Sequence, residues 1–198
     1  METIAPFRIT VCGIEELAGH NEAGVSHVLS ILDPDWPVPE AFGGFGEHEK
    51  LELRFFDVIE PDDPDPGPRA EHVDQLLRFG RDLIAEPPPQ AHLLVHCHAG
   101  ISRSTASMAL ILAQALPQQP AEAIMAEILR IREKAWPNLR IVEMGDALLG
   151  RGGTLVAAAH AVYRRQLARR PWLAEEMTKL RRTREIRAAQ AAEAGSAP

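Results

Sequence analysis

The feature that most constrains the fold is the alternation of short apolar runs with longer segments of helical periodicity. The runs are five to seven residues long and rich in apolar and β-branched side chains, as strands are: Phe7–Cys12, Ser26–Leu32, Leu51–Phe56 and His92–His96. The helical segments repeat apolar residues at every third or fourth position: Ala70–Glu86, Ser102–Leu116, Ala121–Ala135, Asn138–Leu149, Thr154–Arg170 and Pro171–Ala192. This alternation predicts an α/β domain, with a mostly parallel central sheet flanked by helices and additional C-terminal helices.

Prolines and glycines mark the predicted loops and helix ends. Segment 33–46 is rich in both, and segment 60–69 holds four prolines and three aspartates, so both are predicted loops. Pro87–Pro89 is expected to end the helix before it. Asn138 is a favourable N-cap, and Gly150 is a natural stop for the helix that follows. The small residues of Ala188–Pro198 predict a frayed end.

Length and composition bound the class of protein. The 198 residues suit one domain of ordinary size, and a 45% hydrophobic composition supports a buried core and excludes wholesale disorder. Cys12 and Cys97 form neither a disulfide framework nor a CxxC zinc motif. The sequence shows no signal-peptide pattern and no run of 18 apolar residues. We therefore expect a soluble, cytoplasmic protein with reduced thiols and no membrane partner.

The net charge of −7 is unevenly distributed. Residues 160–198 hold nine Lys and Arg against four Asp and Glu, whereas residues 33–65 hold eleven acids against two bases. We divide the chain into a main domain, 1–153, and a basic helical extension, 154–198. Both charged regions are interpreted first as solvated surfaces. The sharper hypotheses are that the acids rim a site, or that the C-terminal helices join two copies in a homodimer. The acidic total argues against nucleic acid as a partner.

One segment, HCHAGISRST at residues 96–105, combines a strand end, a tight turn and a helix start around a cysteine. The amides of such a turn can point inward to form an anion-binding nest, and the helix adds the positive end of its dipole. Gly100 permits backbone angles that a side chain would forbid. Arg103 can donate two hydrogen bonds to phosphate oxygens. Cys97 in such a nest is expected to be a thiolate nucleophile at neutral pH.

This segment resembles the His-Cys-x5-Arg-Ser/Thr motif of the cysteine-based protein tyrosine phosphatases. The mid-chain position of Cys97 resembles the small dual-specificity branch, and Pro137-Asn138 and Leu149-Gly150-Arg151 are similar to segments of small bacterial members. The resemblance covers about residues 7–150 and leaves 151–198 unexplained. It implies a phosphatase-like α/β fold. It also implies hydrolysis of a phosphomonoester through a cysteinyl-phosphate intermediate, with no metal and no cofactor.

The resemblance implies a role for each residue of the motif. Cys97 would attack phosphorus, and Arg103 and the loop amides would hold the equatorial oxygens in the transition state. His96 would brace the loop by hydrogen bonding rather than transfer protons. Ser104 would donate a hydrogen bond to the Cys97 sulfur and help it to leave. The phosphate-binding residues would be His98, Ala99, Gly100, Ile101, Ser102 and Arg103.

The resemblance also calls for a general acid, usually an aspartate on a loop before the cysteine. We predict Asp57, because it follows the strand Leu51–Phe56 and the carboxyl end of a strand lies near the ligand crevice of an open α/β sheet. Asp62 has a spacing closer to the dual-specificity pattern, and Asp63 and Asp65 are further alternatives. That no acid operates is also left open.

The acidic surroundings disfavour a highly anionic substrate. A single phosphomonoester is expected: phosphotyrosine first, then phosphoserine or phosphothreonine on a protein, or a small phosphorylated metabolite. A phosphate-binding module without turnover would share the loop but lack the acid. Cys12 is interpreted as a core residue, or alternatively as a resolving thiol that protects Cys97 from overoxidation.

Overall fold

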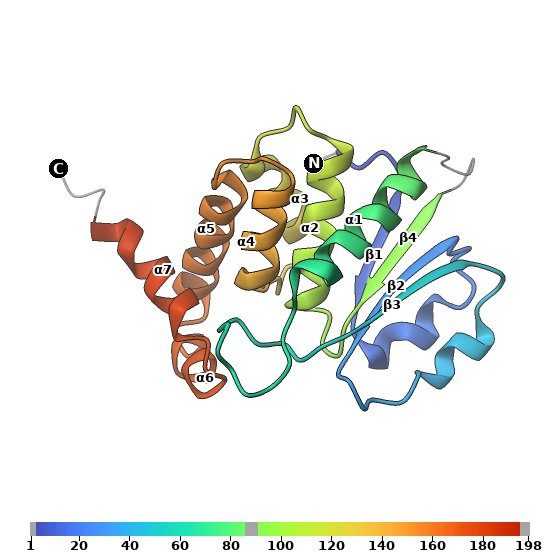
Figure 1. Ribbon diagram of the computed structural model, residues 1–198, viewed down its shortest axis with the longest axis horizontal. Helices are drawn as coiled ribbons and strands as arrows, with labels where there is room; N and C mark the ends of the chain where they lie inside the picture. The colour runs from blue at the N-terminus through green and yellow to red at the C-terminus, as the bar shows by residue number, and fades with distance from the viewer. Residues whose placement is uncertain (1–2, 86–90, 195–198) are drawn as a thin grey trace.

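The sheet positions the rest of the molecule. The computed structural model describes residues 3–85 and 91–194, and within them four parallel strands form one sheet: β1 (Arg8–Cys12), β2 (His27–Leu32), β3 (Glu49–Arg54) and β4 (His92–His96). The order is β1-β4-β2-β3, so β4 lies between β1 and β2 (Figure 1). His96 pairs in register with Cys12 on one side and Ser30 on the other. The carboxyl ends of these three strands therefore meet at one edge, and the predicted α/β class with a parallel sheet is confirmed.

Nine helical segments accompany these strands in the described residues. Seven are α-helices, and two short 3₁₀ helices lie where loops or no element were predicted. They are η1 (Ile14–His20), η2 (Glu40–Gly44), α1 (Ala70–Ala85), α2 (Arg103–Ala115), α3 (Ala121–Ile131), α4 (Leu139–Leu148), α5 (Thr154–Arg169), α6 (Leu173–Lys179) and α7 (Thr183–Ala194). Figure 1 shows the α-helices on one side of the sheet and the two 3₁₀ helices on the other.

Alternate side chains of β4 face two different hydrophobic clusters. Leu93 and Val95 belong to the larger cluster, which the α-helices share, whereas Leu94 packs with Leu17 and Val28 beneath η1 and η2. This follows from the two-residue period of a strand. All five residues of β4 are buried, as expected for a parallel strand that is covered on both faces.

Several element ends were predicted and others were not. The side chain of Asn138 accepts a hydrogen bond from the amide of Ile141 and caps α4, as predicted. The predicted helix 171–192 is wrong as a single element, because a turn at 180–182 separates α6 from α7. The predicted stop at Pro87–Pro89 lies outside the described residues, as do Glu86 and the last four residues of the predicted frayed end.

The C-terminal helices share the main core with the rest of the chain. Leu155, Val162 and Tyr163 of α5 and Ile186 of α7 belong to the same buried cluster as the strands. The ring of Tyr163 stacks on that of Trp136 with the centroids 4.8 Å apart. The helices beyond residue 154 thus pack on their own chain.

No helix in the described part of the chain is long and apolar enough to cross a bilayer.

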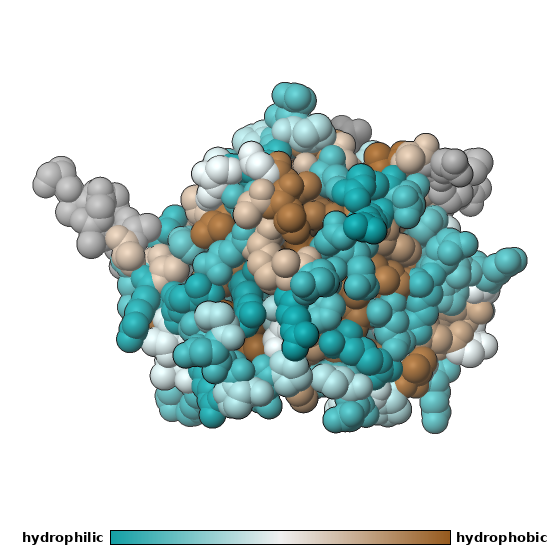
Figure 2. Space-filling model, viewed as in Figure 1, coloured by the Kyte–Doolittle hydropathy of each residue, from teal (hydrophilic) through white to brown (hydrophobic). Residues whose placement is uncertain are grey.

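The face in Figure 2 is mostly hydrophilic along its lower edge, where the carboxyl ends of the strands lie, and its brown residues gather mainly over the helices above. Polar groups therefore dominate the surface around the strand ends in this view.

The close approach of α4 to α2 predicts one strong stability effect. A Cβ on Gly145 would collide with the side chain of Leu110, so we expect Gly145→Val to lower the free energy of unfolding by about 1–3 kcal/mol. Denaturant titration measures this as a lower midpoint at an unchanged slope. Gly43→Val is the matched control, because nothing lies within 4 Å of its Cβ position. Equal stability of the two variants would contradict the close packing.

Candidate active site

The β4–α2 loop, residues 97–102, joins the end of β4 directly to the first residue of α2. Cys97 is buried, with its Sγ 3.2 Å from Oγ of Ser104 in the first turn of α2. The Ser104 hydroxyl is thus placed to donate to the sulfur. The structure brings these two predicted residues together because the strand and the helix meet across only six residues.

The carbonyls of the β4–α2 loop point outward. Each carbonyl from His98 to Ser102 accepts a hydrogen bond from a donor outside the loop. The donors are Ile14 N for His98, Arg132 Nη2 for Ala99, Arg132 Nε for Gly100, Trp136 N for Ile101, and both Asn138 N and Ala106 N for Ser102. Because C=O and N–H of a trans peptide point in opposite directions, outward carbonyls turn the amides toward the inside of the loop. Inward amides form a concave site for an anion.

Gly100 allows the loop to lie against the end of β1. Its φ is +67°, and a Cβ there would collide with the Cys12 carbonyl and lie 2.6 Å from the amide nitrogen of Gly13. Backbone atoms cannot move aside as a flexible side chain can, so the contact requires glycine. The Ile14 amide donates to the His98 carbonyl at 2.9 Å and fixes the same approach.

Arg103 is buried with one edge of its guanidinium already bound. Its Nη1 donates to Oδ1 of Asp33 and to the carbonyl of Phe55, both at 2.6 Å. Its Nε has no hydrogen-bond partner among the described residues. An unpaired buried donor is costly, which favours a ligand oxygen on this edge. Asp33, which follows β2, thus orients the arginine.

Asp57 lies against the β4–α2 loop. Its Oδ1 accepts from Ser102 Oγ at 2.7 Å and from Asn138 Nδ2 at 2.8 Å, and its Oδ2 lies 3.3 Å from Nη1 of Arg182. Burial alone would raise the pKa of Asp57, but the charges of Arg182 and Arg103, with these donors, bring it below its ordinary value. About a third of the side chain (31%) remains exposed.

The two histidines of the motif are neutral at pH 7. Burial lowers the pKa of His96 to about 4, and its Nε2 lies 2.8 Å from Oγ of Ser30 on β2. This contact fits bracing rather than proton transfer. Burial, and then the charge of Arg103, also lower the pKa of His98, whose Nε2 accepts from the Asp33 amide at 3.2 Å.

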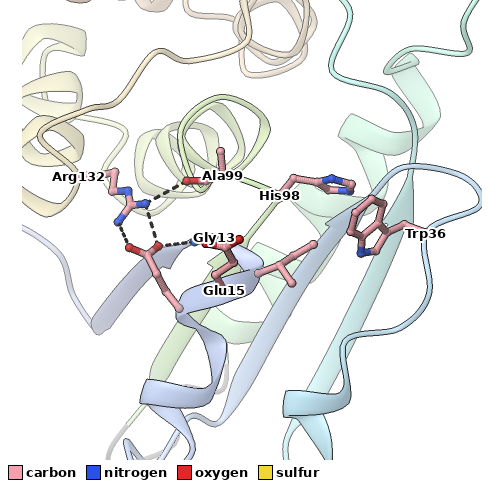
Figure 3. A pocket seen from close by; sticks show the side chains of 8 residues that line it. Gly13, Glu15, Trp36, His98, Ala99 and Arg132 are labelled. Atoms are coloured by element: carbon pink, nitrogen blue, oxygen red, sulfur yellow. Dashed lines mark hydrogen bonds and ion pairs between the residues drawn. The ribbon is translucent and has the colours of Figure 1, made fainter.

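A cavity of about 500 Å³ lies beside the loop (Figure 3). On one side the rings of His98 and Trp36 lie against each other, with their centroids 4.4 Å apart and their planes tilted by 57°. On the other side Arg132 reaches the Ala99 carbonyl and binds Glu16 with both Nη atoms at 2.8 Å. The loop is therefore bordered by an aromatic pair and by a charged pair.

The other aspartates are arranged differently. Asp63 and Asp65 line a second cavity of about 390 Å³ together with Asp57 and the turn between α6 and α7. Asp62 does not line it. The side chain of Asp63 is 6% exposed, and its Oδ2 is 3.6 Å from Nη1 of Arg181.

Sequence reasoning missed Asp33, the bond from Asn138 to Asp57, and Arg182. Asp33 could have been found, because it directly follows a buried strand at the edge where ligands bind in such sheets. Asn138 was predicted only as the N-cap of a helix, and its hydrogen bond to Asp57 was not foreseen. Arg182 is far along the chain, and no local pattern marks it.

Cys12 is a core residue beside the loop. It is 1% exposed, and burial, followed by the charge of Glu16, raises the pKa of its thiol to about 12. The Cys12 thiol therefore stays protonated at neutral pH, and its reactivity is low.

The low reactivity of Cys12 predicts that alkylation is selective. We expect iodoacetate at pH 7 to carboxymethylate Cys97 and to leave Cys12 unmodified, as peptide mass spectrometry would show, and vanadate to protect Cys97. The Cys97→Ser variant should take up no label. Labelling that is confined to Cys12 would contradict the assignment of the reactive thiol.

Comparisons with known proteins bear on the fold. No family model and no curated protein sequence matches the chain. Among solved structures, human DUSP28 matches with a TM-score of 0.55 at 18% identity, covering 76% of this chain and 99% of its own. A mouse putative dual specificity phosphatase, complexed with zinc tungstate, matches with a TM-score of 0.54 at 15% identity and covers 82% and 96%. PTPMT1 in complex with PI(5)P matches with a TM-score of 0.50 at 17% identity and covers 73% and 91%. The chain thus has the α/β fold of the cysteine-based dual-specificity and tyrosine phosphatases.

Proposed function

We propose that the protein hydrolyses phosphomonoesters, with Cys97 as the nucleophile. The observation that carries the proposal is the β4–α2 loop itself. Its carbonyls are hydrogen-bonded to groups around the loop, Cys97 is its first residue, and Arg103, the residue that follows it, has an Nε without a hydrogen-bond partner among the described residues. A tetrahedral oxyanion fits such a set of donors.

In the first step the Cys97 thiolate attacks phosphorus, an S–P bond forms and the P–O bond to the leaving group breaks. The loop amides and Arg103 hold the three equatorial oxygens, on which the transition-state charge lies. Asp33 and the Phe55 carbonyl fix Nη1 of the arginine, so that its other edge is oriented before the substrate binds.

In the second step water attacks the cysteinyl-phosphate, the S–P bond breaks and inorganic phosphate leaves. Ser104 Oγ, 3.2 Å from the sulfur, donates a hydrogen bond that stabilises the departing thiolate. His96 keeps the loop in place through Ser30. No redox or metal chemistry enters either step.

We assign the general acid to Asp57, which would give its proton to the leaving oxygen and later accept one from water. It contacts Ser102 of the loop directly, which supports this choice over the other aspartates. Its pKa is lowered in the free protein, so it is a carboxylate at pH 7 before substrate binds. A bound phosphate dianion beside it raises its affinity for a proton, because like charges disfavour each other.

We propose an aryl phosphate, most directly phosphotyrosine on a protein, as the substrate. The aromatic rings of His98 and Trp36 border the loop and support an aromatic leaving group. The acids of residues 33–65 would repel a polyphosphorylated ligand such as a phosphoinositide headgroup. Phosphoserine, phosphothreonine and small phosphorylated metabolites are the alternatives.

We propose a reducing compartment such as the cytoplasm, because the reaction needs a free thiolate. The hypothesis of a homodimer through the C-terminal helices has less support, since the inward faces of α5 and α7 are already used by their own chain's core.

The nucleophile is tested with p-nitrophenyl phosphate. We expect the wild type to release phosphate and Cys97→Ser to lower kcat at least about 10³-fold, because serine is not ionised at neutral pH. Cys12→Ser is the matched control and should keep the activity. A wild type that binds vanadate but is no faster than Cys97→Ser would instead indicate a binding module without turnover.

The general acid is tested by its dependence on the leaving group. We expect Asp57→Asn to lower kcat about 10²-fold for phenyl phosphate, whose leaving group needs a proton, and much less for p-nitrophenyl phosphate. The rate should fall above the pKa of the acid in the wild type, and this basic limb should disappear in the variant. Asp63→Asn is the matched control. A loss that appears in the control instead would move the role to Asp63.

A further inference from the structure

A buried arginine from the C-terminal segment reaches the candidate active site. The turn at 180–182 joins α6 to α7, and Arg181 in it has φ +59°, the only positive φ at a non-glycine residue in the described ranges. Such a φ is costly for most residues other than glycine and asparagine. The turn directs Arg182 inward, where it is 3% exposed.

The Arg182 guanidinium contacts three groups. Its Nε and Nη2 bind the two carboxylate oxygens of Glu185, each at 2.7 Å. Its Nη1 donates to Ser102 Oγ at 2.8 Å and lies 3.3 Å from Oδ2 of Asp57. The same Ser102 hydroxyl donates to Asp57. One side chain thus connects α7, the β4–α2 loop and the candidate general acid.

Glu185 holds the arginine in one orientation. Its carboxylate, fully buried, also accepts from Trp136 Nε1 at 2.5 Å and from the Leu139 amide at 3.0 Å. The backbone of Trp136 in turn binds the Ile101 carbonyl of the loop. The bidentate pair is therefore fixed on the same framework that fixes the loop.

A buried ion pair of this kind contributes little to stability beyond what an apolar pair of similar volume would give. Its consequence at the site is a fixed position for the Asp57 carboxylate, and the positive charge of Arg182 also lowers the pKa of Asp57. The charged and titratable groups near Asp57 are Arg182 from the turn, Arg103 from α2, His98 of the loop and Asp63 of the adjacent cavity. Of the two cations, Arg182 is the one that contacts the Asp57 carboxylate directly.

We propose that Arg182 is a positioning residue for the hydrolysis, which holds the Asp57 carboxylate against Ser102 and makes the C-terminal segment part of the catalytic apparatus. This inference rests on the proposed function and extends the site beyond the residues of the motif. It assigns a role to the basic extension that the resemblance leaves unexplained.

The test uses a pair of variants that fold alike. Arg182→Met alone would leave the Glu185 charge buried without a partner, so the comparison is between Arg182→Met/Glu185→Gln and Glu185→Gln alone. The single amide oxygen of glutamine can replace only one of the two acceptor oxygens that Trp136 Nε1 and the Leu139 amide use, and this loss is common to both variants, so it cancels in the comparison. At their maximal rates, below the basic limb, we expect the double variant to be about tenfold or more slower than the single variant on phenyl phosphate, and only a few-fold slower on p-nitrophenyl phosphate.

Two further readouts separate positioning from general stability. In an Asp57→Asn background the Arg182 change should cause no additional loss, because residues that act as a unit are not additive. Without the cation the pKa of Asp57 should rise, so the basic limb of kcat/KM should move to higher pH. An unshifted limb, or a full loss in the Asp57→Asn background, would overturn the role of Arg182.

The same pKa can be read without activity. In the Cys97→Ser protein, the carboxyl ¹³C resonance of Asp57 should titrate at higher pH in the double variant than in Glu185→Gln. A wild type without phosphatase activity would overturn the proposed function. If the wild type is active but the pKa of Asp57 is the same in the double variant and in Glu185→Gln, the positioning role alone would be overturned.

Discussion

The candidate site depends on the outward direction of five consecutive carbonyls. The carbonyls of His98 to Ser102 are hydrogen-bonded to donors around the β4–α2 loop. Because the C=O and N–H of a planar trans peptide point in opposite directions, the amides of the loop point inward. The donors come from the start of η1 at Ile14, from the linker between α3 and α4, which includes Arg132, and from Ala106 of α2. The loop is thus shaped by its surroundings as much as by its own residues, and Gly100 lets those surroundings come close enough.

The architecture could be predicted because its causes are local. A strand buried on both faces shows a continuous apolar run, as in His92–His96, and a one-sided helix shows its period, as in Ala70–Ala85. At the motif, residues 96–105, the strand, the turn and the helix start follow directly in the chain, and this brings Cys97 and Ser104 into contact. The Asn138 cap was equally local.

The rest of the site was not predicted, because it is assembled by contacts between distant residues. Asp33 meets Arg103 over a separation of 70 residues, and its position after a strand was the only signal. The break between α6 and α7 has no glycine or proline at Leu180–Arg182, and the helical period of the sequence continues across it. The inward turn of Arg182 is explained by Glu185, Ser102 and Asp57 together, a set that exists only in the folded chain.

The contact between Asp57 and Arg182 spans 125 positions of the chain. During synthesis the domain emerges from the N-terminus first, at about 5–20 residues per second. The motif, the sheet and Asp57 are then all available before residue 182 has been made. In a nascent chain the Asp57 carboxylate would have only Ser102 and Asn138 as partners until Arg182 is made, so the order of translation separates the formation of the anion site from its completion.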